Sequence, residues 1–303
     1  MHARLSPLHL GLAILIVAVW GTNFVVIRRG LDDFPPFLFA FLRFLFSALP
    51  FAFFIRRPDV AWRWLVIYGV FLGAGQFGLL FYALRADISP GLASLVVQTQ
   101  VFFTIALSVW LFKERISAIA LLGTALGAAG LGVVGLHLDA TVTAKGVILV
   151  VCAAFCWACA NIAVKHAVRS GGKTFDMLAF IVWSSIFAVP PLALMTLAFE
   201  GGDAAWQAVS AAGVGAWLAL AWQVLGNTLF AFAAWSWLLT RYDAAVVSPY
   251  ALLVPVFGMG SSAAMLGEPL PAWKFGAAAM VMGGIALITL FAGRRTRVIS
   301  RGP

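Results

Sequence analysis

Charged residues are scarce in this chain of 303 residues. Asp, Glu, Lys and Arg together make up 10% of it, whereas hydrophobic residues make up 63%. A soluble domain carries roughly 25% charged residues, because water must solvate its surface. So few charges cannot cover a water-exposed surface. The composition therefore excludes a soluble protein and indicates that most of the outer surface faces lipid.

Catalytic and metal-binding sets are also missing from the apolar parts of the chain. The four histidines lie near polar links or at the ends of apolar stretches, and no paired Asp, Ser–His pair or His–Glu set falls at membrane depth. The three cysteines share one apolar stretch, Cys152–Cys159, and we interpret them as small residues of a packed helix. We expect no enzyme, no metal and no cofactor.

What the chain does contain is a series of apolar stretches near 20 residues, each long enough to cross about 30 Å of hydrocarbon. Ten such stretches predict an all-α integral membrane protein with ten transmembrane helices. They run over Leu8–Ile27, the segment after Pro36 up to Ile55, Trp64–Leu84, Pro90–Phe112, Ala118–Leu136, Gly146–His166, Met177–Phe199, Val214–Leu239, Ala244–Leu266 and Ala272–Ala292.

The net charge of +9 comes from basic residues in the short gaps between these stretches. We interpret them as topology signals and expect no nucleic-acid partner. If the N-terminus is placed inside, fourteen of the twenty Lys and Arg fall in inner segments and five in outer ones. Short inner loops are the ones that carry excess positive charge. We therefore expect a multi-pass membrane protein with both termini in the cytoplasm.

The second half of the chain repeats the first when it is shifted by 154 positions. In this register Leu84 meets Leu238, and Glu114 meets Glu268. Five helices per half is an odd number, so the second copy must enter the membrane upside down, as inverted repeats of transporters do. We expect a first repeat over 1–136, a link over 137–145, a second, inverted repeat over 146–293 and a basic cytoplasmic tail over 294–303, with a central cavity between the repeats.

Several motifs make the resemblance to a known family specific. They are Trp20-Gly21-Thr22-Asn23-Phe24, Arg43-Phe44, Ala93-Ser94-Leu95 leading to Leu111-Phe112-Lys113-Glu114-Arg115, and Ser248-Pro249 leading to Leu266-Gly267-Glu268-Pro269. Over nearly its whole length the chain resembles the EamA-like branch of the drug/metabolite transporter superfamily. By overall likeness it is most similar to bacterial YddG-type amino-acid exporters. The resemblance implies ten helices as two inverted repeats, a central cavity, and export of amino acids or similar metabolites.

Polar and aromatic side chains recur within the spans. Because an unpaired amide is costly in lipid, these groups must face other helices or water. For each one alone, an interhelical hydrogen bond is the simpler interpretation, whereas together they indicate a wet cavity that suits a zwitterion. The predicted substrate-binding residues are Trp20, Asn23, Gln76, Tyr82, Ser94, Gln98, Trp157, Asn161, Asn227, Ser248 and Tyr250. Gln100 points elsewhere if the fourth span is one regular helix.

Arg43 is the one cation deep in a span, and such a charge costs about 2.5–3.5 kcal/mol on insertion scales. Either it pairs with a substrate carboxylate, or it holds helices together by bonding to acceptors where they cross. Prolines within the spans remove backbone hydrogen bonds and are either hinges or static kinks. The candidate hinges are Pro50, Pro190, Pro249 and Pro255.

All eleven acidic residues lie in links or at span ends, so the middle of each span lacks a carboxylate. Proton-coupled pumps usually keep one there. The leading hypothesis is therefore an alternating-access exporter of amino acids or similar small metabolites that works by facilitated transport. A drug or nucleobase efflux carrier is the alternative, and a channel fits less well because no charged ring or filter is visible. The oligomeric state stays open, with a monomer as the simplest case.

Overall fold

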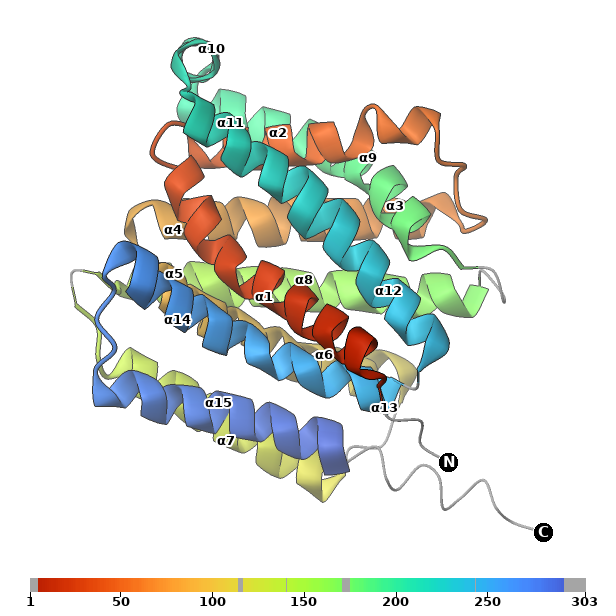
Figure 1. Ribbon diagram of the computed structural model, residues 1–303, viewed down its shortest axis with the longest axis vertical. Helices are drawn as coiled ribbons and strands as arrows, with labels where there is room; N and C mark the ends of the chain where they lie inside the picture. The colour runs from red at the N-terminus through yellow and green to blue at the C-terminus, as the bar shows by residue number, and fades with distance from the viewer. Residues whose placement is uncertain (1–4, 114–116, 140, 171–174, 243, 292–303) are drawn as a thin grey trace.

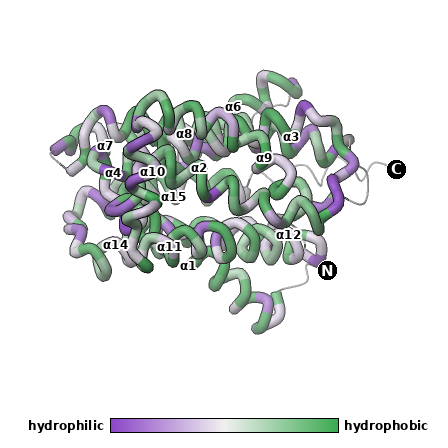
Figure 2. Tube along the Cα trace, turned by 90° about the horizontal axis from the view of Figure 1, so that it is seen from above, coloured by the Kyte–Doolittle hydropathy of each residue, from purple (hydrophilic) through white to green (hydrophobic). Residues whose placement is uncertain are grey.

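The computed structural model describes residues 5–113, 117–139, 141–170, 175–242 and 244–291. Within these residues, ten helical spans are long and apolar enough to cross a membrane, which confirms the predicted fold class. The spans lie side by side in one bundle (Figure 1), and hydrophilic residues gather mostly toward the two ends of the bundle (Figure 2). The basic tail over 294–303 and Glu114 lie outside the described residues.

Several spans consist of more than one helical element. In chain order the elements are α1 (Pro7–Gly30), α2 (Pro36–Ala48), η1 (Phe51–Phe53), α3 (Trp62–Gly69), η2 (Val70–Gly78), α4 (Leu79–Ala86), α5 (Pro90–Val96), η3 (Val97–Thr99), α6 (Gln100–Phe112), α7 (Ala118–Gly135), α8 (Ala144–Ser170), α9 (Met177–Met195), η5 (Thr196–Glu200), α10 (Gly202–Ala211), α11 (Val214–Ala221), η6 (Trp222–Phe230), α12 (Ala231–Arg241), α13 (Ala244–Val247), η7 (Ser248–Leu253), α14 (Val254–Leu266) and α15 (Ala272–Phe291).

The spans run between two ends of the bundle. We call the end that contains Pro7 and Arg241 the termini end, because the first helix begins there at Pro7 and the last helix, α15, ends there at Phe291 (Figure 1). The opposite end contains Gly30 and Glu268, and we call it the Glu268 end. These two names carry no assumption about which end faces the cytoplasm.

The third and eighth spans contain π-helical turns in corresponding places. Each is nine residues long, over Val70–Gly78 and Trp222–Phe230. The fourth and ninth spans are interrupted by 3-10 turns, after which an α-helix begins at Gln100 and at Val254. These two starts are 154 positions apart, the same shift that relates the halves in sequence. Hydrophobic length predicted each span as one regular helix, because it does not register a change of helix type.

Three of the four candidate hinge prolines stand at the ends of elements rather than inside them. Pro50 follows the end of α2, and Pro249 and Pro255 lie in the first turns of η7 and α14. A backbone N–H in a first turn has no partner within its helix, so these two prolines fit without losing a bond. Whether these prolines act as hinges stays a prediction. Pro190 does lie inside a helix, α9.

The last helices of the two halves, α7 and α15, pack against each other through glycines. A methyl group added at Gly123 would lie 2.5 Å from the carbonyl oxygen of Gly284, and one added at Gly130 would lie 3.0 Å from that of Ala277. Position 123 corresponds to 277, and position 130 corresponds to 284, at the shift of 154. Gly123 thus contacts Gly284, while Gly130, the counterpart of Gly284, contacts Ala277, the counterpart of Gly123. Such reciprocity is typical of a two-fold axis.

Candidate functional site

A chain of buried polar side chains joins the second, eighth and first spans. The guanidinium of Arg43 donates to Gln223 Oε1 at 2.8 Å and to Thr228 Oγ1 at 3.2 Å. Gln223 Nε2 in turn donates to Asn23 Oδ1 at 2.6 Å. All four residues are at most 4% exposed. The network therefore connects helices of both halves in a region shielded from solvent.

The positive charge of Arg43 is balanced by neutral groups. Within the described residues, no Asp or Glu lies within ion-pair distance of it. Its guanidinium carbon lies 3.7 Å from the centre of the Phe77 ring, a geometry in which the ring quadrupole attracts the cation. Since protein acceptors use two of its nitrogens, this arrangement favours the helix-joining role of Arg43 over the carboxylate-binding role.

The π-helical turn η6 explains why Gln223 and Thr228 meet Arg43 together. Thr228 Oγ1 also donates to the carbonyl oxygen of Gln223 at 2.8 Å, five residues earlier. In a regular α-helix, positions four apart share a face, which pairs Gln223 with Asn227. In η6 the spacing widens, and Thr228 takes that place beside Gln223. The sequence pattern therefore missed Thr228, and only the hydroxyl itself could have signalled it.

A second polar cluster lies between the sixth and fourth spans. Asn161 Nδ2 donates to Gln100 Oε1 at 2.8 Å and to Thr104 Oγ1 at 3.2 Å. The sequence placed Gln98 on the shared face and Gln100 away from it. The 3-10 turn at Val97–Thr99 changes the residue spacing there, so that Gln100 is the residue that meets Asn161. All three residues of the cluster are partly exposed, unlike the Arg43 network.

Aromatic rings from the first and eighth spans meet beside the Arg43 network. The Trp20 ring lies 5.4 Å from that of Phe232 and 5.1 Å from that of Trp235, centre to centre. Trp20 Nε1 is buried without a protein partner among the described residues, as are Arg43 Nε and Gln76 Oε1. Ser47 Oγ is in the same state. Buried polar atoms nearly always have a hydrogen-bond partner, so each of these atoms can still bond to a polar guest.

Two predicted substrate residues have other partners. Ser94 is fully buried, its hydroxyl donates to the Gly91 carbonyl at 2.6 Å, and it packs on Gly258. Tyr82 is exposed at the Glu268 end, where its ring stacks on Phe37 and its hydroxyl accepts from Lys145 at 3.4 Å. Helix packing accounts for Ser94, and a surface contact accounts for Tyr82.

The remaining predicted substrate residues fall into two groups. Gln76, Gln98 and Asn227 are buried, at 8% exposure or less. Trp157, Ser248 and Tyr250 are partly exposed. The last two belong to η7, the 3-10 turn of the ninth span.

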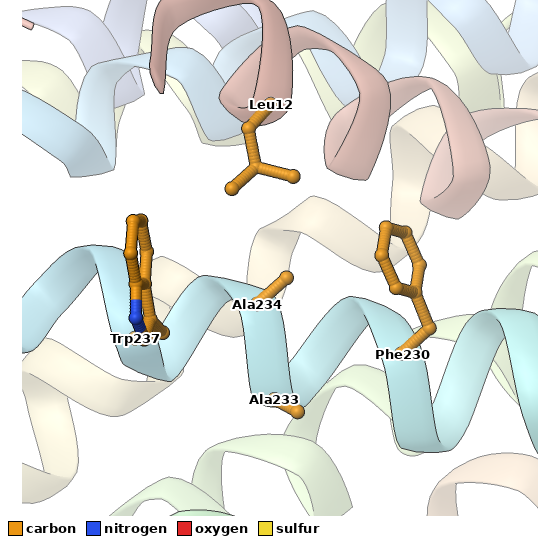
Figure 3. Close-up of a pocket in the computed structure, with 5 residues that line it drawn as sticks. All are labelled: Leu12, Phe230, Ala233, Ala234 and Trp237. Atoms are coloured by element: carbon orange, nitrogen blue, oxygen red, sulfur yellow. The ribbon is translucent and has the colours of Figure 1, made fainter. Parts of the chain in front are cut away.

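A surface groove near the termini end runs between α1 and α12. It is lined by Leu12, Phe230, Ala233, Ala234 and Trp237, whose side chains are apolar except for the indole nitrogen (Figure 3). None of the predicted substrate residues lines it. A groove of this composition offers no partner for a zwitterion, and we do not assign the substrate to it.

The described residues form a ten-helix bundle with corresponding breaks in its two halves and polar groups buried between them. The model of the EamA-like transporter family matches residues 8–136 and again residues 144–290. The chain belongs to the EamA-like transporter family. It is thus a multi-pass membrane transporter and not an enzyme, and its environment includes the lipid bilayer and a small-molecule substrate.

Named relatives agree with this family assignment. A protein of Salmonella typhimurium described as a probable amino-acid metabolite efflux pump is 38% identical over 296 residues, which cover 95% of this chain and 97% of the relative. A protein of Escherichia coli with the same description is 36% identical over 297 residues, with 96% and 97% coverage. A solved crystal structure superposes with a TM-score of 0.61 at 22% identity, over 96% of this chain and 99% of that one. This likeness shows the fold.

Proposed function

We propose that this transporter exports amino acids or similar small metabolites by alternating access, and that it works by facilitation. The observation that carries the proposal is the pair of polar clusters that join the halves, one around Asn23 and one around Asn161. The ring of Trp20 lies one turn from Asn23 in α1. Amide groups can hold a carboxylate, and aromatic faces can attract an ammonium group. The names of the two relatives point to the same substrate class.

The partly exposed residues are the ones we propose to contact the substrate first. Trp20, Trp157, Asn161 and Tyr250 come from spans of both halves and are accessible in this conformation. Buried Gln98 and Asn227 become part of the central cavity as the halves move. Arg43 stays in its network and keeps the first, second and eighth spans in register.

The proposed mechanism needs two halves that exchange conformations. The reciprocal contact of α7 with α15 and the matching breaks at Gln100 and Val254 support two halves related by a two-fold axis. Because each half has five spans, we propose that the axis lies in the membrane plane and the repeat is inverted. The excess of Lys and Arg in the predicted inner segments supports a termini end that faces the cytoplasm of a bacterial cell.

Uptake of labelled amino acids into vesicles that hold the purified protein tests the function. We expect saturable flux that needs only a substrate gradient and that unlabelled amino acids compete. Asn161→Ala should raise the KM, whereas Gln207→Ala on the exposed face of α10 should leave it unchanged. Flux that requires a proton gradient would contradict facilitation. Flux of drugs or nucleobases, with none of amino acids, would favour the alternative substrate class.

A further inference from the structure

The carboxylate of Glu268 gathers donors from three spans at one end of the bundle. It accepts from Lys274 Nζ at 2.7 Å, from Ser89 Oγ at 2.5 Å, from the backbone N–H of Gly91 at 2.9 Å and, at short range, from Ser262 Oγ. The side chains of Glu268 and Lys274 are 6% and 4% exposed. Hydrogen bonds to an ionised acceptor are roughly twice as strong as neutral ones.

These four donors divide evenly between the two halves of the chain. Lys274 and Ser262 belong to the second half, like Glu268 itself, whereas Ser89 and Gly91 belong to the first. If the halves separate at this end, only the last two bonds break. Glu268 then keeps its cation and one hydroxyl, so its charge stays paired. The contact can therefore open and close without exposing a bare carboxylate to a partly apolar surface.

The corresponding positions at the termini end differ in chemical type. In the register of 154, Glu114 replaces Glu268, but Asp243 stands where Ser89 does and Ala120 stands where Lys274 does. A carboxylate replaces a hydroxyl donor, and a methyl group replaces the cation. Glu114 and Asp243 lie outside the described residues, so the comparison rests on their chemical type alone.

Burial follows the same asymmetry. Every residue of 92–99, directly beneath Glu268, is buried. The corresponding segment at the termini end is 246–253, and seven of its eight residues are partly exposed. The two segments are related by the shift of 154 and have similar helix types, but they differ in how tightly they are packed. The bundle is closed at the Glu268 end and looser at the termini end.

We infer that Glu268 is a latch that holds the halves together at the Glu268 end, and that the bonds from Ser89 and Gly91 break when this end opens. The inference rests on the proposed alternating-access function and identifies Glu268 as the residue that holds the halves in position. Because residues 92–99 are buried whereas seven of the eight residues of 246–253 are partly exposed, the conformation closed at the Glu268 end is the resting one.

The test compares reagent access at two repeat-related positions, Val97 and Ala251, each replaced by cysteine after the three native cysteines are replaced by alanine. In vesicles of known orientation, an impermeant maleimide should label Ala251→Cys from the termini end and leave Val97→Cys protected. Ser89→Asp, which copies Asp243 of the other half, should speed labelling of Val97→Cys by roughly tenfold or more and slow that of Ala251→Cys. Glu268→Gln should act in the same direction.

Asp32→Asn is the matched control, because Asp32 is a carboxylate at the same end that pairs with Arg28 of its own half. It should change neither labelling rate. Unchanged rates in Ser89→Asp and Glu268→Gln would overturn the latch, and so would a parallel rise at both positions, which indicates general loosening. Labelling needs no substrate, so a failed flux assay and a failed latch are separate results.

Discussion

A guanidinium inside a membrane span must find acceptors within the protein, and Arg43 finds two that are uncharged. Their partners extend the contact to Asn23, so that one side chain fixes the relative position of three spans. Removing one partner of a buried hydrogen bond leaves the other unsatisfied, which costs about 1–3 kcal/mol. The network therefore has to be complete in order to stabilise the fold.

We predict that Arg43→Gln lowers both thermal stability and transport, because Gln223 and Thr228 lose a forked donor and Phe77 loses its cation. Arg43→Lys should rescue only part of the stability, since an ammonium lacks the planar fork. Thermal unfolding in detergent and substrate flux in vesicles measure the two effects. Arg85→Gln, at an exposed position, should change neither. Full stability and flux in Arg43→Gln would show that the network is dispensable.

The sequence predicted which kinds of polar residue lie in the site better than it predicted which of them form hydrogen bonds with each other. Asn23 and Asn161 were predicted as site residues, and both lie in polar clusters. Gln100 and Thr228 were missed because a period of 3.6 residues was applied across a 3-10 turn and a π-helical turn that do not have it. Whether these clusters bind substrate stays a prediction.

At the level of elements, hydrophobic length predicted the number of spans, and the structure confirms ten. Length alone did not predict the nine-residue π-helical turns or the 3-10 turns at Val97–Thr99 and Ser248–Leu253. A change of helix type alters the backbone hydrogen bonds but not the hydropathy of the residues. The hydropathy of an apolar stretch therefore cannot reveal such a change. The prolines at 249 and 255, which lie in the first turns of η7 and α14, were the one usable signal of a break.

The contact of α7 with α15 leads to a prediction for Gly123. Its added side chain would meet the Gly284 carbonyl, a backbone atom that cannot turn aside. We expect Gly123→Leu to force the helices apart at a cost of about 1–3 kcal/mol, seen as a lower Tm in detergent. Gly132→Leu, in the same helix with nothing within 4 Å, should leave the Tm unchanged or raise it slightly. Equal Tm values for the two variants would contradict this packing.

At the scale of the whole molecule, Glu268 makes the cohesion of the halves dependent on pH. Burial raises the pKa of its carboxyl, but hydrogen bonds from Lys274, Ser262, Ser89 and Gly91 outweigh this and lower the pKa below the ordinary 4.5. The charged form is thus favoured by folding. Its stabilisation is complete above pH 4.5 and is lost as the pH falls through the lowered pKa.

We therefore predict that the Tm of the wild type falls as the pH drops below 4.5, and that Glu268→Gln shows a smaller fall over the same range. Asp139 is exposed and also has a lowered pKa, so it adds a fall of the Tm at low pH that the wild type and Glu268→Gln share. Thermal unfolding at a series of pH values measures the difference. Parallel curves for the two proteins would mean that Glu268 is not the group that titrates.

The reciprocal glycine contact between α7 and α15 has a consequence for how the polypeptide must be connected. A surface that pairs with its own counterpart can hold two separate polypeptides together, as in symmetric dimers. The halves then do not need the covalent link between α7 and α8 in order to stay together. Fragments 1–136 and 137–303, produced together, should assemble into an active carrier, and Gly123→Leu in the first fragment should prevent them from doing so.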